Sequence, residues 1–112
     1  MIVVVFEFWP KPGQEARYFD LASGLKPLVE GVDGFISVER AKSVTHEGKF
    51  VSVSFWRDEA AVERWHAAAR HRAAQALGKS EIFSDYRITV ASTLRQYSMG
   101  EPRPARAAPP AP

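Results

Sequence analysis

The stretch WHAAARHRAAQ, residues 65–75, brings a tryptophan, two histidines and two arginines together among alanines, in a chain that has no cysteine. An imidazole can act as a general base near neutral pH and remove a proton from a phenolic hydroxyl. A large indole beside small alanines leaves room for a flat ligand. Two interpretations follow: a reactive site with Trp65 as its aromatic wall and His71 as its base, or a surface helix whose Trp65 packs into the core.

Helix geometry treats these side chains differently. On a straight helix Trp65 shares an apolar stripe with Val62 and several alanines, and core packing is the commoner fate of a single helical tryptophan. His71 lies ~120° from Trp65 around the helix, at ~100° per residue, so it faces the same side only if the helix bends. An exposed histidine and a catalytic base therefore both stay open for His71. His66 and Arg70 have the i,i+4 spacing of an ordinary surface pair.

Two charged residues interrupt otherwise apolar strands, Glu7 in IVVVFEFW and Arg87 in YRITVA. A charge on a buried sheet is costly unless it is paired. Either Glu7 and Arg87 pair across neighbouring strands, or Arg87 serves a pocket and stabilises a phenolate or enolate oxygen. Ser52 and Ser54 are either small pocket-lining groups or residues at a seam between two copies of the chain.

Alternating strands and helices must position these groups. Helical spacing of apolar residues predicts helices at about Gln14–Glu30 and at Glu59–Leu77. Runs of β-branched and aromatic residues are typical of strands, and four such runs occur. The predicted strands are Ile2–Trp9, Phe35–Ser43, Phe50–Trp56 and Asp85–Met99.

The ends of the predicted helices have local signals. Gly24 and Pro27 weaken the second half of the first helix and are expected to bend it or end it early. Asp58 is a suitable N-cap for the second helix, and Gly78 stands in a favourable position to end it. The apolar stripe predicted for the first helix consists of Ala16, Phe19, Ala22, Leu25 and Val29.

The element order β-α-β-β-α-β predicts a ferredoxin-like α+β fold, an antiparallel sheet with both helices on one face. The other face would then be bare, although the first strand carries Val3 and Val5 on one side and Ile2 and Phe6 on the other. A large exposed apolar patch marks an interaction surface. We therefore expect a homodimer in which two sheets pack face to face into a closed or nearly closed barrel.

Composition excludes several other classes of protein. The chain has 112 residues, 46% hydrophobic and 25% charged, with a formal charge of +2, which is typical of one soluble domain without a nucleic-acid surface. The absence of cysteine excludes disulfides and thiolate metal sites. The apolar N-terminus is interrupted by Glu7 and resembles neither a signal peptide nor a membrane span, so we expect a cytoplasmic protein. We expect one domain at 1–98 and a flexible Pro/Ala-rich tail at 99–112.

Several motifs resemble the antibiotic biosynthesis monooxygenase domain, a family of the dimeric α+β barrel superfamily. They are FWRDEAAVERW at residues 55–65, HRAAQALG at 71–78 and YRITVA at 86–91, and the resemblance covers about residues 2–98. It implies a substrate pocket between the sheet and the helices of each subunit. It also implies the oxidation of a polycyclic phenol to a quinone by O₂ without metal or flavin.

The resemblance also implies roles for single residues. It makes Trp65 the helical tryptophan and Arg87 the last-strand arginine of such enzymes, and it puts His71 at the position of their tyrosine. The position of their asparagine falls on Ala61, so that polar group is absent. We predict Trp65, His71 and Arg87 as catalytic residues. The predicted substrate-binding residues are Trp56, Ser52, Ser54 and Glu7.

The predicted function is that of a small monooxygenase that needs no cofactor and oxidises a hydrophobic aromatic substrate. One alternative is a haem-binding or haem-degrading protein of the same superfamily, which the chain resembles through Trp56 and Trp65. That branch has an axial histidine where Gln75 stands here, and His71 lies one turn earlier. It also has an asparagine near the position of Glu7. A second alternative is a dimer that binds a small ligand without catalysis.

Overall fold

The computed structural model describes residues 1–76 and 82–100, and for 70–76 it describes the helical backbone without the side chains. Most of the predicted tail, residues 101–112, therefore lies outside the described residues. The order of the elements is the predicted β-α-β-β-α-β. Their bounds are β1 Ile2–Pro10, α1 Glu15–Glu30, β2 Phe35–Lys42, β3 Phe50–Trp56, α2 Glu59–Ala76 and β4 Phe83–Ser92.

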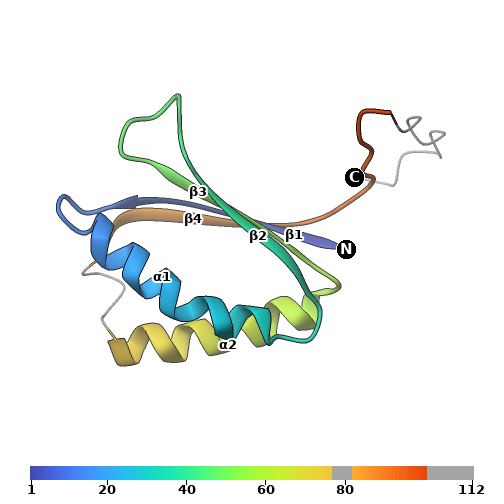
Figure 1. Cartoon of the computed structure of the whole chain (residues 1–112), viewed down its shortest axis with the longest axis horizontal. Coiled ribbons are helices and arrows are strands. Elements are labelled where there is room, and N and C mark those ends of the chain that lie inside the picture. Colours follow the sequence, from blue (N-terminus) through green and yellow to red (C-terminus); the bar gives the residue numbers. More distant parts are fainter. Residues whose placement is uncertain (77–81, 101–112) are drawn as a thin grey trace.

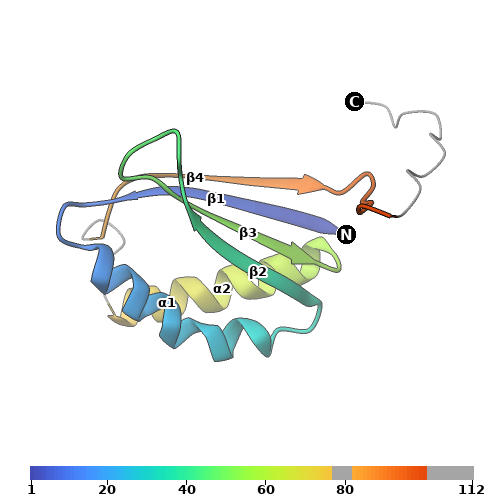
Figure 2. The ribbon, with the colours of Figure 1, turned by 45° about the horizontal axis from the view of Figure 1, so that its top comes forward.

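The four strands form one antiparallel sheet in the order β2-β3-β1-β4. Both helices lie on one face of this sheet, with α1 and α2 side by side beneath it (Figures 1 and 2). The predicted ferredoxin-like fold is confirmed. No described helix or strand covers the other face of the sheet.

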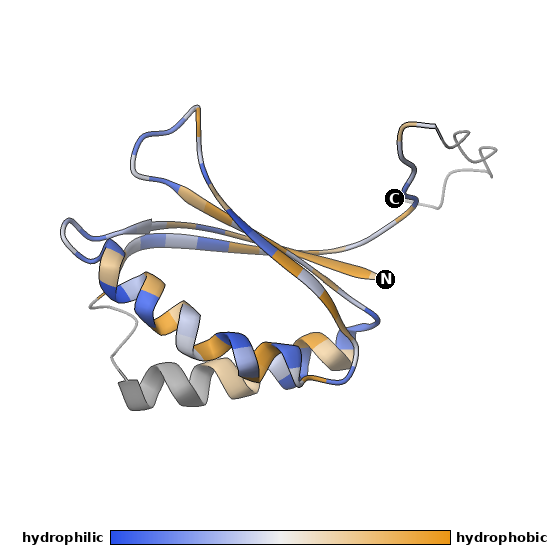
Figure 3. Ribbon diagram, viewed as in Figure 1, coloured by the Kyte–Doolittle hydropathy of each residue, from blue (hydrophilic) through white to orange (hydrophobic). Residues whose placement is uncertain are grey.

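Strand register decides which side chains face the helices. Phe8 of β1 is completely buried and contacts Tyr18 of α1, so the even-numbered residues of β1 form the inner face of the sheet. Their partners on β3 are also inner-face residues, since Phe8 pairs with Phe50 and Phe6 with Ser52. The outer face has the odd-numbered residues of β1 and their partners. Figure 3 shows hydrophobic residues along β1 up to the N-terminus.

The core consists of two separate groups of buried side chains rather than one. One group lies at the start of α1 and contains Phe8, Tyr18 and Phe50, with Ile82 beside them. The other lies where α1 ends and α2 begins, and its buried members are Val29, Trp56 and Ala61. Partly buried residues pack against each group, such as Phe6 against the first and Trp65 against the second. Space is left between them, under the middle of the sheet.

The first helix differs from its prediction in two respects. Pro27 does not end it, and α1 continues to Glu30. Its buried side chains are those of Tyr18, Ala22 and Val29, whereas the predicted stripe member Phe19 is 41% exposed. Tyr18 takes the inward position because of where α1 lies on the sheet: its ring contacts Phe8 of β1, and Ala22, four residues later on the same helix face, is buried with it.

The start of the second helix confirms the predicted cap. The Asp58 carboxylate accepts a hydrogen bond of 2.9 Å from the backbone N–H of Ala61. This bond lowers the pKa of Asp58, and the neighbouring Arg57 guanidinium lowers it further. The predicted stop at Gly78 lies outside the described residues.

The last strand is shorter than predicted. It ends at Ser92 rather than Met99, and it begins at Phe83 rather than Asp85. The reason is its partner: β4 pairs with β1, whose Ile2 lies opposite Ser92 and whose Pro10 lies opposite Phe83. Beyond Ser92 one further hydrogen bond, from the Thr93 N–H to the Met1 carbonyl, ends the ladder.

Gly34, just before β2, makes a closely packed turn possible. Its φ is +96°, and a Cβ added to it would lie 2.7 Å from the Cβ of Ala61, which is completely buried. We expect Gly34→Ala to lower the free energy of unfolding by about 2–4 kcal/mol, because the left-handed backbone and the clash both cost free energy. Urea denaturation measures the loss. Gly48→Ala is the matched control, since Gly48 has a φ of +77° and open space around it. An equal loss in both variants would contradict the role of the Ala61 contact.

Candidate functional site

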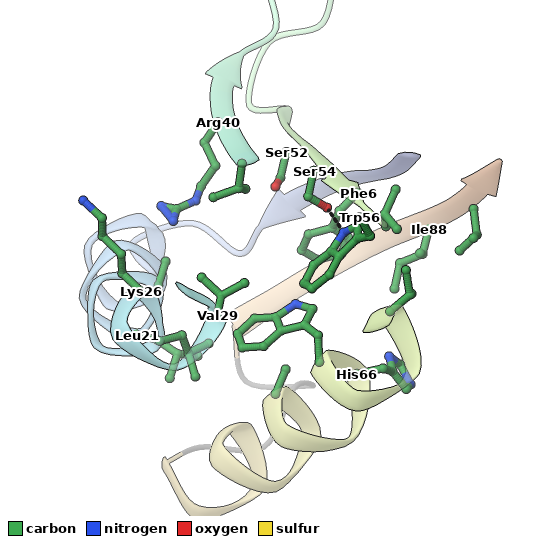
Figure 4. A pocket seen from close by; sticks show the side chains of 18 of the residues that line it. Phe6, Leu21, Lys26, Val29, Arg40, Ser52, Ser54, Trp56, His66 and Ile88 are labelled. Carbon is green, nitrogen blue, oxygen red and sulfur yellow. Dashed lines mark hydrogen bonds between the residues drawn. The ribbon is translucent and has the colours of Figure 1, made fainter. Parts of the chain in front are cut away.

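A cavity of about 660 Å³ lies between the inner face of the sheet and the two helices (Figure 4). It occupies the space between the two groups of core side chains and takes part of its wall from each. Most of its wall is apolar, with Val4 and Phe6 of β1 above and Leu25 and Val29 of α1 below. A cavity of this size and character is suited to a small hydrophobic molecule.

Two tryptophans form one wall of the cavity. The rings of Trp56 and Trp65 are stacked, with centroids 6.3 Å apart and planes 24° apart. Trp56 is only 1% exposed and also meets Phe35 edge-on, whereas Trp65 is partly exposed. Trp56 is therefore a fixed support, and Trp65 presents an indole surface to whatever enters the cavity.

Ser54 fixes the orientation of the buried tryptophan. Its hydroxyl accepts a hydrogen bond of 2.9 Å from the indole N–H of Trp56. Both residues lie on the inner face of β3, two positions apart, so the strand itself sets their spacing. Ser52, one inner-face position further along, also lines the cavity.

Polar groups lie at the edges of the cavity. Lys26 of α1 and Arg40 of β2 line it on one side, and Glu63 and His66 of α2 line it on the other. Figure 4 shows Arg40 and Lys26 together, across the cavity from His66. Along β4 the cavity is open, because Ile88 lines it and is still 43% exposed.

The structure brings four of the predicted site residues to this cavity, Trp56, Trp65, Ser52 and Ser54. His71 is part of the helical backbone of α2, but its side chain lies outside the described residues, as does that of Gln75. Ala61, where the resemblance expects an asparagine, is completely buried and lies outside the cavity lining.

Arg87 and Glu7 lie on the outer face, away from this cavity. They pair directly across β1 and β4, and the Glu7 carboxylate accepts hydrogen bonds of 2.7 and 3.0 Å from the Arg87 guanidinium. Lys49 donates a third, of 2.8 Å. Of the two alternatives drawn from the sequence, the cross-strand ion pair is the one found. Neither residue lines the cavity. The pocket roles expected for Glu7 and Arg87 would require the inner face of the sheet, and both lie on the outer face.

These contacts make Glu7 sensitive to acid. The hydrogen bonds from Arg87, and after them those from Lys49, lower its pKa from 4.5 to about 2. A carboxyl group with a lower pKa in the folded than in the unfolded chain stabilises the fold at pH values above its unfolded pKa. This contribution of Glu7 is lost as the pH falls from about 4.5 towards 2. We expect the urea midpoint of the wild type to fall more steeply than that of Glu7→Gln in this window. Glu47→Gln, in the exposed hairpin, is the control. Parallel curves for wild type and Glu7→Gln would contradict the assignment.

Sequence reasoning missed the three charged residues and the histidine that line the cavity: Lys26, Arg40, Glu63 and His66. Signals for two of them were present. His66 lies four residues after Val62, so the two share a helix face although His66 was assigned to the solvent side. Arg40 lies two residues after Val38 on the same strand, and the two therefore share a sheet face.

The described part of the chain contains no group of three or more histidine, cysteine, aspartate or glutamate side chains that could hold a metal ion. Within that same part, no helix has both the length and the apolar character needed to cross a bilayer.

The structure is thus an α+β domain with a largely apolar cavity between the sheet and the helices. Residues 1–77 match the family model described as antibiotic biosynthesis monooxygenase. The chain belongs to this family.

Two curated proteins are similar to the chain. The jasmonate monooxygenase ABM of Pyricularia oryzae is 40% identical over 90 residues, which cover 80% of this chain and 42% of that protein. The chain thus spans less than half the length of this relative. The uncharacterized protein YqjZ of Bacillus subtilis is 28% identical over 86 residues, covering 77% of this chain and 74% of that one.

Solved structures share the fold at lower identity. Rv0793 from Mycobacterium tuberculosis has a TM-score of 0.72 at 20% identity, covering 87% of this chain and 98% of its own. A mutant of SnoaB, a cofactor-independent oxygenase from Streptomyces nogalater, has a TM-score of 0.69 at 13% identity, covering 85% and 94%. At these identities the likeness supports the architecture alone.

Proposed function

We propose that this chain is a small oxygenase domain that binds a hydrophobic, ring-containing substrate in its cavity and oxidises it with O₂, without a metal or organic cofactor. The observation that carries the proposal is the cavity of about 660 Å³ with the Trp56–Trp65 stack as its wall, in a chain of a monooxygenase family. A flat ring can lie against the exposed indole of Trp65. SnoaB, which shares the fold, is described as cofactor-independent.

The chemistry needs a base and an electron-rich substrate. Removal of a proton from an activated CH₂ group beside a phenol ring gives a carbanion that can reduce O₂. One oxygen atom then becomes the new carbonyl, and the other leaves as water. The CH₂ group supplies all four electrons and both hydrogens, so no further reductant is required. Two histidines are proposed as the base: His66, which lines the cavity, and His71, which the family resemblance favours.

An oxygen electrode tests the proposal with dithranol, an anthrone, as substrate. We expect O₂ uptake that saturates with substrate and continues after dialysis against EDTA. Under ¹⁸O₂ the quinone product should gain one labelled oxygen atom. No uptake above the buffer rate with dithranol, a hydroquinone or jasmonate would overturn the proposal. His66→Ala and His71→Ala, made singly, identify which imidazole acts as the base.

Jasmonate is a second candidate substrate. The relative named as a jasmonate monooxygenase is 40% identical to this chain, the match covers 80% of the chain, and its name gives a small carboxylate with an apolar body as substrate. The cavity wall has the apolar character that such a body requires. Mass spectrometry of jasmonate incubated with the protein under ¹⁸O₂ would reveal a product in which one CH₂ group has become a labelled carbonyl if this proposal holds, and unlabelled jasmonate alone would exclude it.

We further propose that the chain works as a homodimer through the outer face of its sheet. At the centre of this face Val5 pairs with Val53, and Val3 pairs with Phe55. These side chains are only partly buried, and no described element covers them. Apolar side chains left open over the middle of a sheet favour association with a second copy, whose matching face would cover them.

We expect light scattering to give twice the chain mass for the wild type, and Val53→Glu to shift the protein towards the monomer, because the new carboxylate would be buried without a partner at the interface. Ser23→Glu, on the exposed side of α1, introduces the same charge and should leave the mass unchanged. A wild type that stays monomeric at high concentration would contradict the dimer.

A further inference from the structure

The two ends of the cavity differ in chemistry. Towards α2 the wall is formed by the Trp56–Trp65 stack. Towards α1 and β2 it has two cations, Lys26 of α1 and Arg40 of β2, which lie on the same side of the cavity (Figure 4). The acid that lines the cavity, Glu63, belongs to α2.

Arg40 and Lys26 differ from the other basic residues near the sheet in what they contact. Arg87 and Lys49 are held by Glu7, and Arg57 is held by Asp33 with two hydrogen bonds of 3.1 Å. Within the described part of the chain, the side chains of Arg40 and Lys26 have no hydrogen bond and no ion pair. Their charges are thus available to a molecule in the cavity.

Two hydroxyl groups lie at the same end. Ser52 is the cross-strand partner of Arg40 and lines the cavity. Tyr18 is 8% exposed and also lines it. Burial raises the pKa of the Tyr18 phenol, so it stays protonated and can donate a hydrogen bond, while the positive charge of Arg40 acts in the opposite direction and is therefore near enough to influence it.

We propose that this end of the cavity binds the carboxylate of an amphipathic substrate, with Arg40 as its principal anchor and Lys26 as a second cation, while the apolar body of the substrate lies against Trp56 and Trp65. The proposal rests on the proposed function, since it specifies the substrate of the same cavity. A guanidinium matches the two oxygens of a carboxylate and can bind both. Ser52 and Tyr18 supply hydroxyl donors beside it.

Geometry favours a carboxylate at the end of the molecule over a charge at its centre. The cations stand at the edge of the cavity, where Arg40 and Lys26 are both exposed to solvent, and the middle of the cavity is apolar. A charged group placed at the edge keeps part of its hydration, whereas one placed among the tryptophans would lose it without a partner. The substrate would therefore enter with its ring first and leave its carboxylate at the edge.

The test compares acids with their uncharged methyl esters. Isothermal titration calorimetry at low salt would measure the Kd of the wild-type protein for jasmonic acid and methyl jasmonate, and for 1-naphthaleneacetic acid and its methyl ester. We expect each acid to bind about tenfold more tightly than its ester, a difference that shrinks as salt screens exposed charges. The ester affinity reports the apolar contacts alone.

Variants then locate the anchor. We expect Arg40→Gln to remove most of the preference for acid and to leave ester affinity unchanged, Arg40→Lys to keep part of it, and Lys26→Gln to have a smaller effect than Arg40→Gln. Lys42→Gln, on the same strand but outside the cavity lining, is the matched loss of one positive charge and should change neither affinity.

Other outcomes separate this proposal from the proposed function. Equal binding of acid and ester by the wild type, or an equal loss of both affinities in Arg40→Gln, would overturn the carboxylate anchor. If methyl jasmonate or the naphthalene ester is consumed with O₂ while the acid is not, the oxygenase proposal stands and the anchor fails. If the wild type binds neither member of either pair, the carboxylate anchor fails, and O₂ uptake with dithranol still decides the oxygenase proposal.

Discussion

Replacement of Trp56 by alanine is expected to lower the free energy of unfolding by about 3–5 kcal/mol, the usual cost of removing a large buried aromatic side chain. Trp56 is 1% exposed, stacks on Trp65 and meets Phe35 edge-on with ring centroids 5.3 Å apart. The space left by the indole would extend the cavity towards the buried side chains of Val29 and Ala61. A domain of this size has only about 5–15 kcal/mol of stability, so a large part would be lost.

Urea denaturation followed by circular dichroism measures this effect, at one fixed protein concentration because the proposed dimer would also stabilise the fold. Trp65→Ala is the control and should cost less, since its ring is partly exposed. Trp56→Phe should cost about 2 kcal/mol, because Ser54 loses its indole donor and a smaller void remains. Equal losses for Trp56→Ala and Trp65→Ala would show that Trp56 is no more a structural support than its neighbour.

The element order and the sheet were predictable because they depend on local patterns. The run at Ile2–Trp9 is apolar at both odd and even positions, and the structure places it at the centre of the sheet as β1. The Asp58 cap was equally predictable, because the capping bond joins residues only three positions apart. Features of this kind need no knowledge of distant contacts.

Features that depend on a partner far along the chain were not predictable. β4 ends at Ser92, which lies opposite Ile2 at the end of its pairing with β1, and the residues around Ser92 do not reveal this register. The inward position of Tyr18 rather than Phe19 depends on where α1 lies on the sheet. Both aromatic residues contact the core, but only Tyr18 is buried.

The candidate site was predictable only in part, for the same reason. Trp65 could be expected to point inward from its stripe with Val62, and the structure places both in the cavity lining. Arg87 was expected there as well, but a shift of one residue moves a strand side chain to the opposite face. Register with β1 puts Arg87 beside Glu7 on the outer face. The sequence shows that Arg40 shares a sheet face with Val38, but only the alignment of β2 with β3, where Arg40 pairs with Ser52, shows that this face lines the cavity.

Trp65 is where the proposed function has its largest expected effect. Its indole lines the cavity, is partly exposed and rests on the fixed ring of Trp56. Trp65→Ala removes the flat surface against which a substrate ring would stack, and it leaves the cavity wider, so the reacting carbon would be held less firmly relative to the base and O₂. We expect kcat/KM for dithranol to fall by about 10- to 100-fold, with part of the loss in kcat.

The matched control is Trp9→Ala, which removes the same side chain from β1, outside the cavity lining. Trp9 instead lies beneath the ammonium of Lys49, which is 5.2 Å from its ring centroid. We expect Trp9→Ala to keep the wild-type kcat/KM, and Trp65→Phe to recover most of the activity lost in Trp65→Ala, because a smaller ring still offers a flat surface. Steady-state O₂ uptake measures all three variants. Should Trp65→Ala turn over dithranol within about twofold of the wild type, the indole wall would have no part in holding the substrate.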